Sequence, residues 1–119
     1  MRILQIGWMK PALAVIALAT VSSDCSSRGV TFTIRNVGNT PLAGVVVRVT
    51  GNSYSIGDVL VNQTRSVVVK PSGESHIEIE QAGHQPLVVD CYFEPGYAGD
   101  VSADVTTDKV VSVKNNIRI

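Results

Sequence analysis

From residue 30 onward, hydrophobic and polar side chains alternate along the chain with a period of two. The pattern begins in VTFTIR, where Val30, Phe32 and Ile34 fall on one side of the segment and two threonines fall on the other. Such alternation places successive side chains on opposite faces of a strand, whereas a helix repeats its apolar residues every three or four positions. No helical stripe is sustained after residue 30. The pattern therefore predicts β-strands that share one core.

The alternation continues through VVVRV (45–49), SVVV (66–69), HIEIE (76–80), LVVDCYF (87–93), DVSADV (100–105) and VVSVKNNIRI (110–119). Gly, Pro, Asn and Asp separate these segments, as turns require. Seven or eight short strands at this spacing predict an all-β fold, a single Ig-like antiparallel β-sandwich over residues 30–119. The residues predicted to face its core are Val30, Phe32, Ile34, Val45, Val47, Val49, Val67, Val69, Ile77, Ile79, Leu87, Val89, Cys91, Phe93, Val101, Ala103, Val105, Val111, Val113, Ile117 and Ile119.

Residues 1–21 form an apolar leader. Arg2 and Lys10 precede the run PALAVIALATV, and the triplet ALA at 17–19 fits a small-residue cleavage site. This arrangement is typical of a secretory signal peptide. An uncleaved membrane anchor is the alternative, although Lys10 near its middle would cost roughly 2.5–3.5 kcal/mol. A third possibility is a core segment of a cytoplasmic protein. We expect export to the periplasm or cell envelope, with residues 22–29 as a polar linker.

The chain has two cysteines, Cys25 and Cys91. In an exported protein an even number of cysteines suggests a disulfide. A bridge between these two would contribute on the order of 4 kcal/mol through the entropy of the unfolded chain. The alternative is two separate thiols, with Cys91 as a small core residue.

The charge balance narrows the range of partners. Ten Lys and Arg residues balance ten Asp and Glu residues, and aromatic residues make up only 5 % of the chain. Nucleic-acid binding requires clustered basic side chains, which the sequence lacks. We therefore expect no nucleic-acid partner, and contact with a membrane only through the N-terminal segment if it stays uncleaved.

The stretch NVGNTPLAG (36–44) lies between two predicted strands. Gly38 and Asn39 tolerate positive φ, while Pro41 fixes φ and has no N–H to donate to a sheet. These residues are typical of a turn. The stretch contains no nucleophile paired with a base, so we interpret it as a corner of the fold and not as a catalytic site.

Two longer stretches, TIRNVGNTPLAGVVVRVTG (33–51) and YSIGDVLVNQTRSVVVKPSGE (54–74), together resemble the bacterial Ig-like sandwiches of the CARDB and related cell-envelope families. The residues that carry the resemblance are Asn36, Gly38, Ile56, Gly57, Val59 and Leu60. The resemblance implies an envelope module that serves binding or assembly. It names no ligand.

Motifs for catalysis or metal binding are missing from the sequence, which has no G-x-S-x-G, H-E-x-x-H, C-x-x-C, P-loop or G-x-G-x-x-G. His76 alternates with Glu78 and Glu80, which favours a solvated strand face over a metal site. His84 lies in a predicted turn. We therefore expect no enzyme, no cofactor and no resident metal.

The acidic residues raise a question of register. If the segments around Glu78, Asp90 and Asp104 were consecutive hairpins, Ile77 would pair with Cys91, and these three carboxylates would stand in one row on the outer face. The same register pairs Cys91 with Ala103 and Phe93 with Val101. Like charges directly across a sheet are destabilising. A long Lys or Arg could approach the row, the strands could lie in different sheets, or the row could form a weak Ca²⁺ site.

The candidate binding residues are thus Glu78, Asp90, Asp104 and Tyr97. Tyr97, in the loop EPGYAGD, could offer a flat contact surface, and packing of the loop is the alternative. We predict a noncatalytic module that binds a protein or glycan of the envelope. The second hypothesis is a chaperone-like or surface-assembly subunit that uses strand addition.

Overall fold

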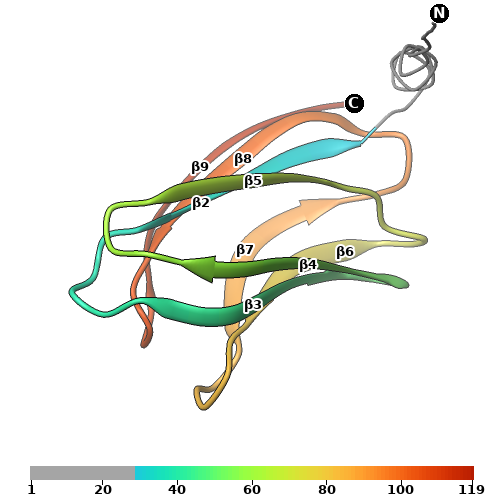
Figure 1. The fold of residues 1–119 in the computed structure, drawn as a ribbon. Helices are drawn as coiled ribbons and strands as arrows, with labels where there is room; N and C mark the ends of the chain where they lie inside the picture. The colour runs from blue at the N-terminus through green and yellow to red at the C-terminus, as the bar shows by residue number, and fades with distance from the viewer. Residues whose placement is uncertain (1–28) are drawn as a thin grey trace, which may run out of the picture.

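The structure, a computed structural model, describes residues 29–119, which form eight β-strands in two four-stranded sheets (Figure 1). The strands are β2 (Val30–Asn36), β3 (Leu42–Val49), β4 (Asn52–Val59), β5 (Thr64–Val69), β6 (Ser75–Glu80), β7 (Leu87–Phe93), β8 (Ala98–Val105) and β9 (Val110–Arg118). The predicted all-β sandwich is confirmed. The described residues contain no helix long and apolar enough to cross a membrane.

The strand order is β5-β2-β8-β9 in one sheet and β4-β3-β6-β7 in the other. Four connections, β2–β3, β4–β5, β5–β6 and β7–β8, pass from one sheet to the other, so only β3–β4, β6–β7 and β8–β9 are hairpins. The prediction of a wholly antiparallel fold was wrong at one place, because β2 and β8 pair in parallel. Parallel neighbours cannot be joined by a tight turn, and here the intervening strands of both sheets separate β2 from β8 along the chain.

The core lies between the two sheets and is mainly aliphatic. Phe32 and Phe93 are its two phenylalanines, and Val and Ile dominate the rest. Leu42 and Val59, which the alternation did not identify, are completely buried opposite each other on β3 and β4. They were missed because Gly44 and Gly57, both with positive φ, interrupt the period of two with irregular pairing.

The prediction that Val111, Val113 and Ile119 belong to the core was wrong. Val111 is 50 % exposed, Val113 38 % and Ile119 95 %, while Ile117 packs partly against the core. β9 is the outermost strand of its sheet, and the strand of the opposite sheet that packs against it, β7, is also an edge strand. Too little of the opposite layer therefore faces β9 to bury its apolar side chains.

The corner at residues 36–41 is built around Asn36, which is completely buried. Its side-chain amide donates to the carbonyls of Thr40 (2.9 Å) and Val59 (3.1 Å), and its Oδ1 accepts from the N–H of Gly38 (2.9 Å). The predicted turn is confirmed, but not with positive φ at Gly38 or Asn39. Gly38 is required for close approach, because a Cβ there would lie 3.1 Å from the Cβ of a threonine in the β8–β9 turn.

Candidate functional site

A sandwich has two open sides where its edge strands face each other, and here these are β4 with β5 and β7 with β9. The β4–β5 side is closed by side chains. The hydroxyl of Tyr54 accepts from the N–H of Lys70 (2.9 Å), and Asn52 donates to the Lys70 carbonyl. The guanidinium of Arg65 on β5 donates to the carbonyl of Ile56 on β4 (2.9 Å). Side chains therefore bridge this side within the domain, from β4 to Lys70 and from β5 to the carbonyl of Ile56.

We predict that Tyr54→Phe destabilises the domain by about 1 kcal/mol, the usual net worth of a hydrogen bond. The Tyr54 ring packs partly against the core, and its hydroxyl bonds to Lys70. The substitution therefore removes the hydrogen bond and keeps the packing of the ring. Urea unfolding of the two variants Tyr54→Phe and Tyr92→Phe measures the effect. The Tyr92 hydroxyl donates to Glu94 on the exposed surface, so its loss should shift the unfolding midpoint little. Equal losses in both variants would contradict closure by Tyr54.

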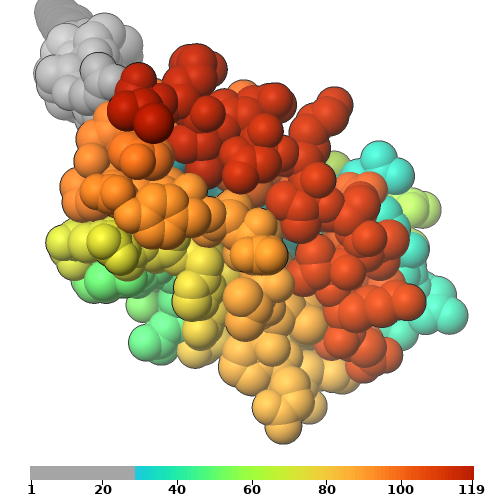
Figure 2. Space-filling view, turned by 180° about the vertical axis from the view of Figure 1, so that it is seen from behind, coloured from blue at the N-terminus to red at the C-terminus, as the bar shows by residue number. Residues whose placement is uncertain are grey.

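The β7–β9 side has no such closure. Within residues 29–119, no side-chain hydrogen bond or ion pair joins β7 to β9. Among the eight described strands, β9 alone has no fully buried residue. Figure 2 shows the side chains of β9, in red, spread over the surface on this face of the molecule. This strand is therefore an edge that the domain itself leaves uncovered.

Both strands of this side carry exposed apolar side chains. Val88 and Tyr92 project from β7, and Val111 and Val113 from β9. An isolated exposed valine is ordinary on a protein surface. Val88 and Tyr92 alternate with the buried residues of β7 and therefore lie on the outer face of their sheet, whereas Val113 lies opposite the buried Ala103 on the inner face of the other sheet. The apolar residues that an added strand at β9 could cover are thus those of β9 itself.

The backbone of β9 also offers free hydrogen-bonding groups. In an antiparallel pair, residues that bond to the neighbouring strand alternate with residues whose N–H and C=O point away. The N–H of Ile117 donates to Oδ1 of Asn115 (3.0 Å), and a Cβ added to Gly99 on β8 would lie 2.3 Å from the carbonyl oxygen of Asn116. Asn116 thus faces β8, and the odd-numbered residues from Val113 to Ile117 direct their backbone groups to the free edge.

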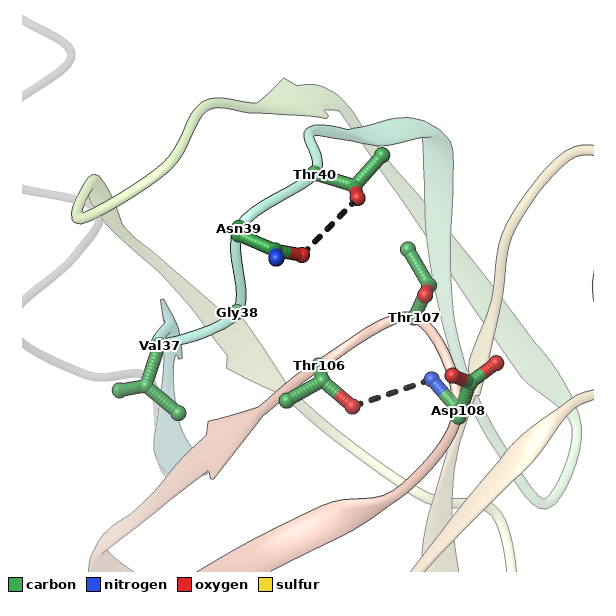
Figure 3. Close-up of a pocket in the computed structure, with 7 residues that line it drawn as sticks. All are labelled: Val37, Gly38, Asn39, Thr40, Thr106, Thr107 and Asp108. Atoms are coloured by element: carbon green, nitrogen blue, oxygen red, sulfur yellow. Dashed lines mark hydrogen bonds between the residues drawn. The ribbon is translucent and has the colours of Figure 1, made fainter.

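A second feature is a hollow of about 420 Å³ where the β2–β3 turn meets the β8–β9 turn (Figure 3). Hydroxyl and amide groups line it, but several already hold the turns together. The Oγ1 of Thr40 donates to Asn39 (3.3 Å), and the Oγ1 of Thr106 accepts from the N–H groups of Asp108 (3.1 Å) and Lys109 (3.2 Å). The hollow lies between the two turns, and within the described residues the Thr107 hydroxyl and the Asp108 carboxylate in its lining take no part in these turn contacts.

The predicted row of acids does not exist. β7 and β8 lie in different sheets, so Asp90 cannot stand opposite Asp104. An irregularity in the β6–β7 pairing moves Glu78 opposite Val88 and Ile77 opposite Val89, and neither Cys91 with Ala103 nor Phe93 with Val101 forms a pair. The structure thus supports the alternative of separate sheets and removes the basis for a Ca²⁺ site. Residues 29–119 contain no group of three or more side chains suited to hold a metal.

Asp104 instead has a basic neighbour. In the register of the first sheet it lies opposite Arg35 of β2 and Ser112 of β9, and it accepts a hydrogen bond from the Ser112 hydroxyl (3.4 Å). A long cationic side chain therefore lies beside Asp104, as one of the alternatives proposed. The Asp104 carboxylate thus contacts the neighbouring strand of its own sheet and is not part of an acidic cluster.

Of the other acids, Asp90 is exposed on the outer face of β7, while Glu80 and Glu78 have exposed basic partners. Arg48 contacts Glu80 (3.2 Å) and His76 contacts Glu78 (3.5 Å) on the outer face of β3 and β6. Pairs this exposed contribute about 0–1 kcal/mol, so the predicted solvated face is confirmed. Tyr97 is half-buried and packs against the core, which agrees with loop packing.

Cys91 packs in the core, where burial is the main cause that raises the pKa of its thiol to about 11. Such a thiol stays protonated and unreactive at neutral pH. Cys25 lies outside the described residues, so the disulfide remains a prediction.

The chain has little detectable similarity to known proteins. No family model matches the sequence, and neither does any curated protein. A protein from Eubacterium rectale whose structure was solved by NMR is similar to this chain with a TM-score of 0.45 and 10 % identity, covering 71 % of this chain and 87 % of that one. At this level the likeness carries no inference about ligand or activity.

Proposed function

We propose that residues 30–119 are a noncatalytic binding module of an exported envelope protein, and that the module binds a polypeptide by strand addition to the free edge of β9. The single observation that supports this most is the asymmetry of the two open sides. The domain bridges the β4–β5 side with its own side chains, whereas within residues 29–119 no side-chain hydrogen bond or ion pair joins β7 to β9, and β9 carries exposed apolar residues.

Strand addition fits the chemistry of this edge. The backbone groups of an added strand would pair with those of β9, and its alternate side chains would cover Val113 and Ile117. Natural proteins usually protect an edge strand with charges, prolines or bulges to prevent unwanted pairing. β9 has part of this protection, since Lys114 and Arg118 are charged and its pairing with β8 is irregular between Asp104 and Val105, but no proline interrupts it.

A glycan or loop-bound partner is the weaker candidate. In the polar hollow at the β2–β3 and β8–β9 turns, the hydroxyls of Thr40 and Thr106 are engaged in turn contacts. The apolar leader is the reason to propose export and an envelope location. Residues 1–28 lie outside the described range, so both remain part of the proposal.

The proposal is tested with the full chain as bait against the envelope fraction of its host. Asn115→Pro removes an outward N–H from β9 and leaves the residues that pair with β8 unchanged, a substitution that edge strands tolerate. Asn115→Ala is the matched control, because it removes the same side chain and keeps the N–H. We expect partner recovery to survive Asn115→Ala and to fall at least about fivefold with Asn115→Pro, since one ladder bond of about 1 kcal/mol is lost. Recovery unaffected by the proline would place the binding elsewhere.

A further inference from the structure

We propose that the polypeptide bound at the β9 edge is a second copy of this chain, with the two β9 strands pairing antiparallel around Asn115. This inference rests on the proposed function, because it needs the same free edge. Pairing of this kind would join two four-stranded sheets into one sheet of eight strands. The outward-facing residues of β9 are arranged symmetrically about Asn115.

The backbone geometry permits the pairing. Val113, Asn115 and Ile117 direct their backbone groups outward, with Asn115 at the centre of the three. When Asn115 lies opposite Asn115 of the second copy, Val113 lies opposite Ile117 of that copy, and each of the three pairs can exchange two hydrogen bonds. The N–H of Ile117, now bound to the Asn115 side chain, would be released for this purpose.

The side chains match in the same register. On the inner face, Val113 meets Ile117 of the second copy, so an exposed apolar residue covers a half-buried one. On the outer face, Lys114 meets Asn116 and Ser112 meets Arg118, so no like charges stand opposite each other. Apolar cross-strand pairs each contribute roughly 0.2–1 kcal/mol.

Charge excludes the neighbouring registers. Because only the odd-numbered residues face outward, the pairing can shift only in steps of two residues. A shift in one direction sets Lys114 opposite Lys114 of the second copy, and a shift in the other sets Lys114 opposite Arg118. Like charges directly across a sheet destabilise it. Compared with these two nearest alternatives, the central register is the one that sets no like charges opposite each other.

The area buried between the two β9 strands determines how stable the dimer is expected to be. A pair of edge strands buries less than the roughly 1,000 Å² typical of a stable specific interface. We therefore expect a dimer whose population depends on concentration and not a permanent one.

The test is disulfide capture in the full chain, with Cys25→Ser as background. Cys91 can remain because it is buried and its thiol stays protonated. Residues of a hydrogen-bonded antiparallel pair have Cα atoms about 5.5 Å apart, within the range that a disulfide spans. Asn115→Cys should therefore form a covalent dimer on mild oxidation, seen on a non-reducing gel. Ser112→Cys is the matched control, since it is equally exposed on β9 and would face Arg118, far from its own counterpart.

We expect at least about tenfold more dimer from Asn115→Cys than from Ser112→Cys, falling on dilution. Association through the leader would raise the amount of covalent dimer equally in both variants. Equal cross-linking of the two variants would overturn the proposal. If Asn115→Cys stays monomeric while Asn115→Pro still abolishes capture of another polypeptide, the second copy is excluded and the edge function stands. If neither substitution has an effect, both proposals fall.

Discussion

Val47→Asp should unfold the domain. Val47 lies on β3, in the interior of its sheet between β4 and β6, opposite Tyr54 and Ile79, and is completely buried. A carboxylate at this position would lose its hydration and find no cationic partner. The effective penalty is several kcal/mol per buried ion, a large part of the roughly 5–15 kcal/mol that stabilises an ordinary domain. We expect loss of the cooperative transition in urea and of the β-sheet signal in far-UV circular dichroism.

Thr33→Asp is the matched control for this substitution. Thr33 also lies on a central strand, β2, but its side chain is on the outer face between Ser66 and Ser102. The substitution removes the hydrogen bond between the Thr33 and Ser66 hydroxyls (2.8 Å) and leaves the new charge in solvent. We expect a loss within about 1 kcal/mol. Cooperative unfolding of Val47→Asp near the midpoint of the unchanged chain would show that the assignment of its inner face is wrong.

The faces of most strands could be predicted from the sequence because alternation is a local property. A strand such as β7, with Leu87, Val89, Cys91 and Phe93 buried and the residues between them exposed, follows the period of two throughout. Sheet order is not local. The sequence does not indicate whether β7 continues into β8 as a hairpin or crosses to the other sheet, and the predicted row of Glu78, Asp90 and Asp104 depended on that choice.

The β9 edge could not be predicted for the same reason. The residues Val111 and Val113 follow the alternation of a core strand, yet β9 has a neighbour on one side only and little of the opposite sheet above it. One signal was present, since Asn115 takes an inward position between Val113 and Ile117, where a core strand would carry an apolar residue. It becomes meaningful only when the strand order is known.

Asn36→Asp should destabilise the domain by ~3 kcal/mol or more at pH 7, although it exchanges one amide nitrogen for an oxygen. The buried amide of Asn36 donates to the carbonyls of Thr40 and Val59. A carboxylate has no N–H to donate and would repel both carbonyl oxygens. Burial and this repulsion would raise the pKa of the introduced carboxyl in the folded state above the ordinary value for aspartate, about 3.9.

The raised pKa of the introduced carboxyl determines how the stability of Asn36→Asp changes with pH. A carboxyl with a raised pKa binds more protons in the folded state than in the unfolded state, so the variant loses stability as the pH rises above about 4. The free energy lost relative to the unchanged chain should therefore be smallest near pH 4, where the protonated carboxyl can still donate to one carbonyl, and should grow toward pH 7. Urea unfolding at several pH values measures it.

Asn39→Asp provides the control in the same turn. Asn39 is exposed, and its Oδ1 accepts a hydrogen bond from the Thr40 hydroxyl (3.3 Å), which a carboxylate accepts equally well. Its loss of stability should stay within about 0.5 kcal/mol and should not grow with pH. If Asn36→Asp behaved like Asn39→Asp, the corner would not depend on the amide of Asn36. The buried hydrogen bonds that join the ends of β2 and β4 would then be dispensable, and the reason for an asparagine at this point of the chain would have to be sought outside stability.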